Sequence, residues 1–265
     1  MRLEHLSVID STNAELLRRA AASGASAIHR LALVADHQTA GRGQRGRTWR
    51  DGGQVPGASL LLSLGWVWPG ESSLDGLSLA VGLFVAEVLE ARYTAAERLR
   101  LKWPNDLLCG GGKCGGVLVE SASSDRGQGM AGRVRALVVG IGINLTASPP
   151  GAVEFAHPAA LPPTALAAPG ALDRQRRDEL VACLLPTLAT GLEGLADEGF
   201  APLRARYEAR MAWKGEAVRF ALPTGEVRAG VLLGVTDRGA LRLATADGPL
   251  TLYSGELRPV AQPIA

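Results

Sequence analysis

The hydrophobic pattern of the chain changes near residues 211–213, and this change limits the folds that the sequence can adopt. Before it, apolar runs typical of strands alternate with segments of helical spacing. In the last 53 residues, apolar side chains recur at every second position between turns at Asp237-Arg238-Gly239 and Asp247-Gly248. The pattern predicts an α/β or α+β domain over residues 1–212, followed by a small antiparallel β domain over residues 213–265.

Short local signals predict the elements of the first domain. Thr12 and Glu15 have the spacing of a capping box, and Gly24 stands where the helix after them would end. Pro186 is expected to kink or divide the last helix. The expected strands are Leu31–Ala35, Ser59–Trp66 and Arg133–Gly142, with a hairpin formed by Leu99–Lys102 and Val117–Glu120; the expected helices span about 14–22, 74–90 and 180–195; residues 147–171 are expected to be irregular.

Composition excludes several classes of protein. The net charge is +2, so no bulk basic character drives nucleic-acid binding. No apolar run approaches the roughly 18–20 residues that span a bilayer, and the first residues lack the apolar segment of a signal peptide. Three cysteines without metal-ligand spacing argue against a disulfide scaffold or a zinc site and favour the cytoplasm.

The segment Gly41–Arg50, GRGQRGRTWR, combines three glycines with four arginines. Glycines allow a ligand to approach the backbone, and arginine presents a planar fork that matches phosphate or carboxylate oxygens. The segment fits neither the phosphate-binding P-loop nor the dinucleotide fingerprint. A flexible basic surface loop is the alternative, but the strand expected just before the segment favours a ligand site.

A second segment, Lys102–Leu108 (KWPNDLL), is followed by the glycine-rich run that contains Lys113. Asp106 has the carboxylate that a hard cation such as Mg²⁺ accepts, and Lys113 lies among small residues that would let a phosphate approach. A β-turn with a solvated lysine explains the same residues. The chain has only three lysines against 25 arginines, and two of these lysines, Lys102 and Lys113, lie in this region.

Other polar motifs are weak when each is taken alone. Ser11-Thr12-Asn13 is explained by helix capping, and Gly140–Leu145 (GIGINL) by a strand that ends at glycine and asparagine. Gln38 is unremarkable in isolation. The four histidines have no serine or cysteine partner at motif spacing, so the sequence offers no nucleophile for covalent catalysis.

Taken together and in order, these motifs resemble those of the biotin protein ligases. The matching segments are STN at 11–13, Gln38, GRGQRGRTW at 41–49, KWPNDLL at 102–108, GGKCGGVLVE at 111–120 and GIGINL at 140–145. The resemblance implies a mixed sheet flanked by helices and a C-terminal SH3-like β-barrel. It also implies that ATP activates biotin to biotinyl-5′-AMP, and that a lysine of a carboxylase's biotin carboxyl carrier domain then accepts the biotin.

The resemblance also implies roles for residues at matching positions. Lys113, Arg47, Asp106 and Lys102 would be catalytic, with Asp106 supporting Mg²⁺. Biotin would be bound by Ser11, Thr12, Asn13, Gln38, Arg42, Gly43, Gln44, Lys113 and Gly116, and ATP or the adenylate by Arg42, Arg45, Arg47, Trp49, Asn105, Lys113 and Asn144. Homodimers occur in the family, but the residues themselves indicate no interface.

Two features depart from the family pattern. Many members have arginine where this chain has Gln44; glutamine keeps hydrogen bonding but loses the charge that would hold the adenylate at that point. Some members carry an N-terminal DNA-binding domain, whereas STN begins here at residue 11, so we expect a ligase without repressor activity.

Three other functions are disfavoured by particular sequence features. A lipoate- or octanoate-handling relative would share the catalytic fold, but the glycine–arginine loop and KWPND favour biotin. A nucleic-acid-binding module would need a broad basic patch with exposed aromatic residues, which 5% aromatic content disfavours. A protein that binds biotin without catalysis is disfavoured by the presence of Lys102, Asp106 and Lys113.

Overall fold

The computed structural model describes residues 1–50, 55–93, 99–123, 134–146, 161–168, 171–221 and 226–260. Residue 133 and most of the segment expected to be irregular, 147–171, lie outside this range. The elements are β1 (Arg2–Ile9), α1 (Thr12–Ser23), η1 (Ala25–Ile28), β2 (Leu31–Gln38), η2 (Gln44–Gly46), β3 (Ser59–Pro69), α2 (Leu77–Arg92), β4 (Arg100–Lys102), β5 (Asp106–Cys109), β6 (Gly112–Ser123), β7 (Val134–Asn144), α3 (Arg174–Glu198), η4 (Ala201–Leu203), α4 (Arg204–Arg210), β8 (Ala217–Ala221), β9 (Val227–Val235), β10 (Leu241–Thr245), β11 (Gly248–Leu252) and β12 (Glu256–Pro259).

A seven-stranded mixed sheet in the order β1-β2-β3-β7-β6-β5-β4 forms the frame of the first domain. β1 pairs with β2 in parallel, and the other neighbours are antiparallel. The expected mixed α/β fold is confirmed. Sequence patterns missed β1, because this edge strand is largely exposed and its few apolar residues alternate with charged ones.

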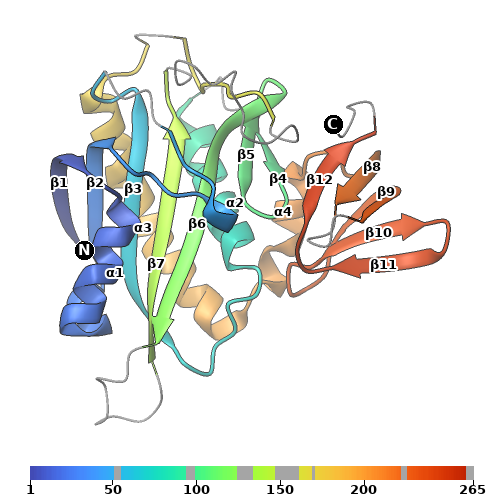
Figure 1. Ribbon diagram of the computed structural model, residues 1–265, viewed down its shortest axis with the longest axis horizontal. Helices are drawn as coiled ribbons and strands as arrows, with labels where there is room; N and C mark the ends of the chain where they lie inside the picture. The colour runs from blue at the N-terminus through green and yellow to red at the C-terminus, as the bar shows by residue number, and fades with distance from the viewer. Residues whose placement is uncertain are drawn as a thin grey trace.

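Helices cover both faces of this sheet (Figure 1). On one face, Leu16 of α1 packs with Leu33 and Val138. On the other face, residues of α2 and α3 join the neighbouring strand positions, such as Val34 and Val139, in the main core. Because successive strand residues point to opposite faces, the alternate positions of β2 and β7 serve the two layers.

Two helix ends differ from the sequence prediction. Ser11, not Thr12, caps α1, since its Oγ accepts a hydrogen bond from the N–H of Ala14 at 3.4 Å. Pro186 does not divide the last helix, since α3 is continuous over its 25 residues. Pro186 and Ala182 are both exposed, so water can reach the carbonyl that loses its helical partner.

By length and composition alone, α3 is apolar enough to cross a membrane. Core helices of globular proteins pass the same test, and here Leu180, Leu184 and Leu188 are fully buried against the rest of the fold.

The expected hairpin between residues 99 and 120 contains one more strand than predicted. β4 pairs with β5, and β5 in turn pairs with β6, so Lys102 stands opposite Asp106 and Leu108 opposite Lys113. The register shifts between Leu107 and Leu108. Lys102 and Lys113 therefore lie on opposite sides of the Asp106 carboxylate.

The C-terminal strands form a five-stranded antiparallel sheet in the order β11-β10-β9-β8-β12. This sheet lies beside β4 and β5 in Figure 1. Trp103 joins the two parts: its buried ring lies 6.3 Å from that of Phe220, and its Nε1 donates to the carbonyl of Gly239 at 2.9 Å. β12 carries Glu256 toward the first domain, where it meets Lys102.

Candidate active site

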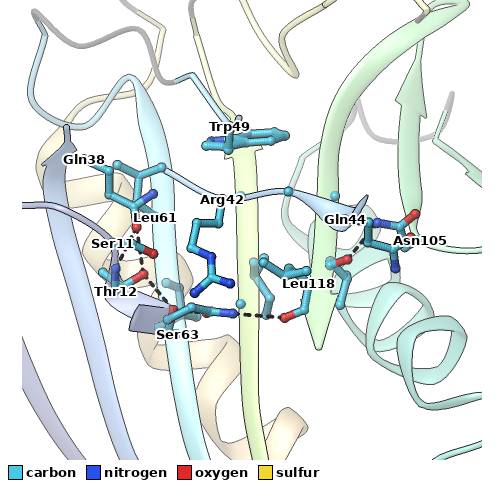
Figure 2. Close-up of a pocket in the computed structure, with 18 of the residues that line it drawn as sticks. Ser11, Thr12, Gln38, Arg42, Gln44, Trp49, Leu61, Ser63, Asn105 and Leu118 are labelled. Atoms are coloured by element: carbon cyan, nitrogen blue, oxygen red, sulfur yellow. Dashed lines mark hydrogen bonds between the residues drawn. The ribbon is translucent and has the colours of Figure 1, made fainter. Parts of the chain in front are cut away.

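A pocket lies over β3, β7 and β6, between the start of α1 and the glycine–arginine loop (Figure 2). The space between its walls, including the part that is open to solvent, is about 490 Å³. The pocket is lined by Ser11, Thr12, Asn13, Gln38, Arg42, Gly43, Gln44, Trp49, Leu61, Leu62, Ser63, Asn105, Lys113, Gly116, Val117, Leu118, Gly140, Ile141 and Gly142.

Buried hydrogen-bonding groups occupy one end of the pocket. The backbone N–H and the hydroxyl of Thr12 approach Gln38 Oε1 at 2.8 and 3.0 Å. Ser63 Oγ lies 2.6 Å from Thr12 Oγ1 and donates to Asn13 Oδ1 at 2.5 Å. Figure 2 shows Thr12, Gln38 and Ser63 together at the left of the pocket. Such a rigid donor and acceptor set suits a compact polar ring.

The glycine–arginine loop folds into a small hairpin above the pocket. The N–H of Trp49 donates to the carbonyl of Gly41, and the N–H of Gly43 donates to that of Arg47, at 2.9 and 2.7 Å. Arg45 and Gly46 at its tip both have positive φ, which glycine adopts without strain. Figure 2 shows Arg42 pointing from this loop into the pocket.

Glycines in the floor of the pocket make room for the side chains above them. A Cβ added at Gly142 would lie 2.6 Å from the Trp49 ring, and one at Gly140 would lie 2.3 Å from Asn13 Oδ1. The two glycines of the GIGINL motif therefore allow close approach, and Ile141 between them also lines the pocket. Asn144 itself does not line the pocket, and its Nδ2 donates to the carbonyl of Thr164 at 3.0 Å.

Lys113 marks the other end of the pocket. Its Nζ lies 5.8 Å from the centre of the Trp49 ring and 2.5 Å from Asp106 Oδ1. Hydrogen bonds with the backbone of Pro162 and Thr164 hold the main chain of Lys113 on both sides. A partly exposed ammonium group on a fixed backbone can bind a carboxylate or phosphate.

Asp106 is buried between two ammonium groups. Lys102 Nζ lies 2.9 Å from its Oδ2, while Lys113 takes its Oδ1. Burial raises the pKa of the Asp106 carboxyl, but the charges of Lys102 and Lys113 outweigh burial and hold it well below its usual range. The side chain is therefore a carboxylate at neutral pH.

This arrangement does not fit Mg²⁺ coordination by Asp106, because both carboxylate oxygens are taken by lysines. Among the residues that the structure describes, no group of three or more His, Cys, Asp or Glu side chains is placed to hold a metal. The geometry assigns Asp106 to holding Lys102 and Lys113.

The remaining expected site residues lie around the pocket rather than in its wall. Arg45 is at the loop tip, and Arg47 Nη2 lies 3.1 Å from Glu256 Oε2 in the C-terminal sheet. Lys102 Nζ reaches the other oxygen of Glu256 at 3.3 Å. Burial raises the pKa of the Glu256 carboxyl, but Lys102 and Arg47 lower it overall. An alternating row of charges thus runs from Arg47 through Glu256, Lys102 and Asp106 to Lys113.

Cys114, next to Lys113, is not a nucleophile. Burial raises the pKa of its thiol to about 12, so the thiol is neutral at physiological pH.

Sequence reasoning missed three polar residues of this region. Ser63 is buried in β3, Glu120 on β6 binds Arg42 and Asn13, and Glu256 binds Arg47 and Lys102. Glu120 is the last residue of the GGKCGGVLVE run, and its place in this motif was the sequence signal that could have identified it. Nothing in the sequence marked Ser63 or Glu256.

The chain is a ligase that joins a carboxylic acid to a protein, as its family and its relatives show. The chain belongs to the biotin/lipoate A/B protein ligase family, whose model matches residues 6–144. Residues 215–257 match the biotin protein ligase C terminal domain. Within the family, the chain is one of the biotin protein ligases.

Individual relatives are similar to this protein over nearly the whole chain. A biotin–[acetyl-CoA-carboxylase] ligase of Paracoccus denitrificans is 36% identical over 252 residues, which cover 94% of this chain and 96% of the relative. One of Mycobacterium tuberculosis is 34% identical, covering 97% and 88%. A biotin protein ligase from Aquifex aeolicus, solved in complex with biotin and ATP, has a TM-score of 0.72 and 27% identity, covering 97% and 99%.

Proposed function

We propose that this chain is an ATP-dependent biotin protein ligase. An oxygen of the biotin carboxylate attacks the α-phosphorus of ATP, the bond to the β-phosphate breaks, and pyrophosphate leaves. The amine of an acceptor lysine then attacks the carbonyl carbon of biotinyl-5′-AMP, forms an amide, loses a proton and releases AMP. The observation that carries this proposal is one pocket with a buried hydrogen-bonding end at Thr12, Asn13 and Gln38 and a lysine at the other.

The polar end fits the ureido ring of biotin. Thr12, Asn13, Gln38 and Ser11 are proposed to orient the ring, and Gly116 leaves room beside Lys113. The biotin carboxylate would then lie toward Lys113, where the ammonium group offsets its charge. Arg42, Gly43 and Gln44 are proposed to close over biotin from the loop.

The nucleotide is proposed to bind beside Trp49 and Asn105. The carboxylate and the triphosphate are both anionic, so their approach needs positive charge. Lys113, with Arg47 and Arg45 nearby, is proposed to stabilise the transition state and the leaving pyrophosphate. Mg²⁺ is proposed to arrive with the phosphates of ATP as part of the substrate. Asn144 is proposed to support the nucleotide end through the segment at Thr164.

The acceptor is proposed to be the biotin carboxyl carrier domain of a carboxylase, which the names of the two relatives support. We further propose that the chain acts in the cytoplasm, because Cys109, Cys114 and Cys183 are thiols rather than disulfides. A homodimer, and the absence of a nucleic-acid partner, remain predictions.

The test is incubation with ATP, Mg²⁺ and a carrier domain, offering biotin or lipoate separately, with the mass of the carrier as readout. We expect the mass of one biotinyl group to be added. A mass shift with lipoate alone would reject the assignment in favour of a lipoate-handling enzyme. Biotin binding with neither pyrophosphate exchange nor a mass shift would make the chain a binding protein.

Gly140→Ala is expected to weaken biotin binding without unfolding the chain. The new methyl group would meet Asn13 Oδ1, and Asn13 cannot move freely because Ser63 and Glu120 bind it. Loss of these hydrogen bonds should raise the half-saturating biotin concentration roughly tenfold. Biotin-dependent ATP–pyrophosphate exchange measures the change. Gly194→Ala is the control, since a Cβ there meets nothing within 4 Å; equal behaviour of the two variants would contradict the prediction.

Replacing Arg42, Arg45 and Arg47 together by glutamine is expected to speed release of biotinyl-adenylate. Gln44 carries no charge, so the neighbouring arginines are proposed to hold the intermediate, and Arg42 and Arg47 also anchor the loop through Glu120 and Glu256. Release from preloaded enzyme should accelerate by roughly tenfold or more. Retention equal to that of the parent chain would show that the loop arginines do not hold the adenylate.

A further inference from the structure

Glu120 links the two parts of the pocket that must act together when biotin binds. It stands on β6 opposite Val138, and its side chain is 19% exposed. Its Oε1 lies 2.8 Å from Arg42 Nη2, while its Oε2 accepts from Asn13 Nδ2 at 3.0 Å. One carboxylate therefore binds both the glycine–arginine loop and the first turn of α1.

A continuous row of hydrogen bonds extends from this carboxylate across the polar end of the pocket. Asn13 Oδ1 accepts from Ser63 Oγ, Ser63 contacts Thr12 Oγ1, and Thr12 contacts Gln38 Oε1. Asn13, one of the groups proposed to meet the ureido ring, is therefore also the group that binds Glu120. On the other side, Glu120 binds Arg42, whose side chain points from the loop into the pocket in Figure 2.

At the base of the loop, the N–H groups of Thr39 and Ala40 donate to the carbonyls of Ile9 and Asp10, just before α1. The hydrogen bonds at Gly41, Gly43, Arg47 and Trp49 are internal to its hairpin, and Arg47 binds the C-terminal sheet. Trp49 rests over Gly142, toward Lys113. A change at Asn13 thus reaches the loop most directly through Glu120.

We propose that Glu120 is a positioning residue that couples occupation of the biotin end to closure of the loop at residues 41–49. Biotin, by fixing Thr12 and Asn13, fixes the Glu120 carboxylate and with it Arg42. The loop then stays closed over the adenylate. This inference rests on the proposed function and adds to it a residue that does not line the pocket.

Glu120→Gln is the direct test. Glutamine keeps the shape of the side chain but turns an NH₂ group toward either Arg42 or Asn13, and both of these are hydrogen-bond donors. The parent chain is assayed first for biotin-dependent ATP–pyrophosphate exchange, which tests the proposed function separately. For E120Q we expect the half-saturating biotin concentration and the rate of adenylate release to rise roughly tenfold. The maximal exchange rate should stay within about twofold, since Lys113 and Asp106 are untouched.

Tryptic cleavage after the loop arginines reports closure itself. Biotin at matched occupancy should slow cleavage at residues 42–50 in the parent chain and fail to do so in E120Q. Equal protection in both would overturn the proposal, as would a fall in maximal exchange rate with unchanged biotin dependence. Glu87→Gln, which removes a carboxylate bound to Arg206 on the surface, is the matched control and should behave as the parent.

A double-mutant cycle with Arg42→Gln separates coupling from a general loss of structure. Arg42 is half exposed, so this variant removes the same ion pair even if E120Q fails to fold. Non-additive effects on the rate of adenylate release are expected, because both single substitutions break the same ion pair between Arg42 and Glu120. Additive effects would exclude coupling through Glu120. Full protection of the Arg42→Gln loop from trypsin by biotin would exclude it as well.

Discussion

Lys113→Ala is expected to abolish adenylate formation while the chain stays folded. A charged group that acts on the transition state is worth about 3 kcal/mol, so biotin-dependent ATP–pyrophosphate exchange should fall roughly 10²- to 10³-fold. The fold should survive, because the side chain is 30% exposed and Asp106 keeps Lys102 at 2.9 Å. Exchange measures the activity, and thermal unfolding measures the fold.

The matched control is Lys214→Ala. Lys214 is 40% exposed and binds Glu208 on the surface, so its removal should leave exchange unchanged. Near-normal exchange by the Lys113 variant would remove this lysine from the proposed chemistry. A large loss of stability in that variant would instead assign it a structural role.

Asp106→Asn is expected to cost about 3–5 kcal/mol of unfolding free energy at pH 7. The amide can accept from one lysine but presents an NH₂ group to the other. Lys102, only 4% exposed, would then keep Glu256 alone as its charged partner. Urea unfolding of the parent and variant chains measures the difference.

The difference in unfolding free energy between the parent chain and Asp106→Asn is expected to decrease at low pH. The pKa of the Asp106 carboxyl is lowered in the folded chain, so its contribution is complete above the unfolded pKa of about 4 and fades as the pH falls through the folded value. The gap between parent and variant should be constant from pH 6 to 8 and shrink below about pH 4. Asp75→Asn, at an exposed pair with Arg238, should change stability by less than about 0.5 kcal/mol. Equal unfolding of the Asp106 variant and the parent at pH 7 would refute a stabilising role for the buried charges.

Local patterns predicted much of the fold because the signals lie within single elements. The helix after Ser11 and the strands at Leu31 and Ser59 were expected close to their observed positions. β1 was missed because an exposed edge strand needs little apolar patterning. The last helix was expected to kink or divide at Pro186; α3 does not divide there, because the proline is exposed and the helix can continue past it.

By itself, the sequence determined the two-part architecture and the set of motifs that identify the family. Those features depend on periodicity and on residues close together in the chain. Only the tertiary structure decided which charges meet: Glu256 lies 154 positions from Lys102, yet both belong to the row that ends at Lys113. It also showed that Asp106 is the partner of two lysines, because the register of β4, β5 and β6 brings both ammonium groups to its carboxylate oxygens. Strand register and domain packing arise from long-range burial, which no local motif encodes.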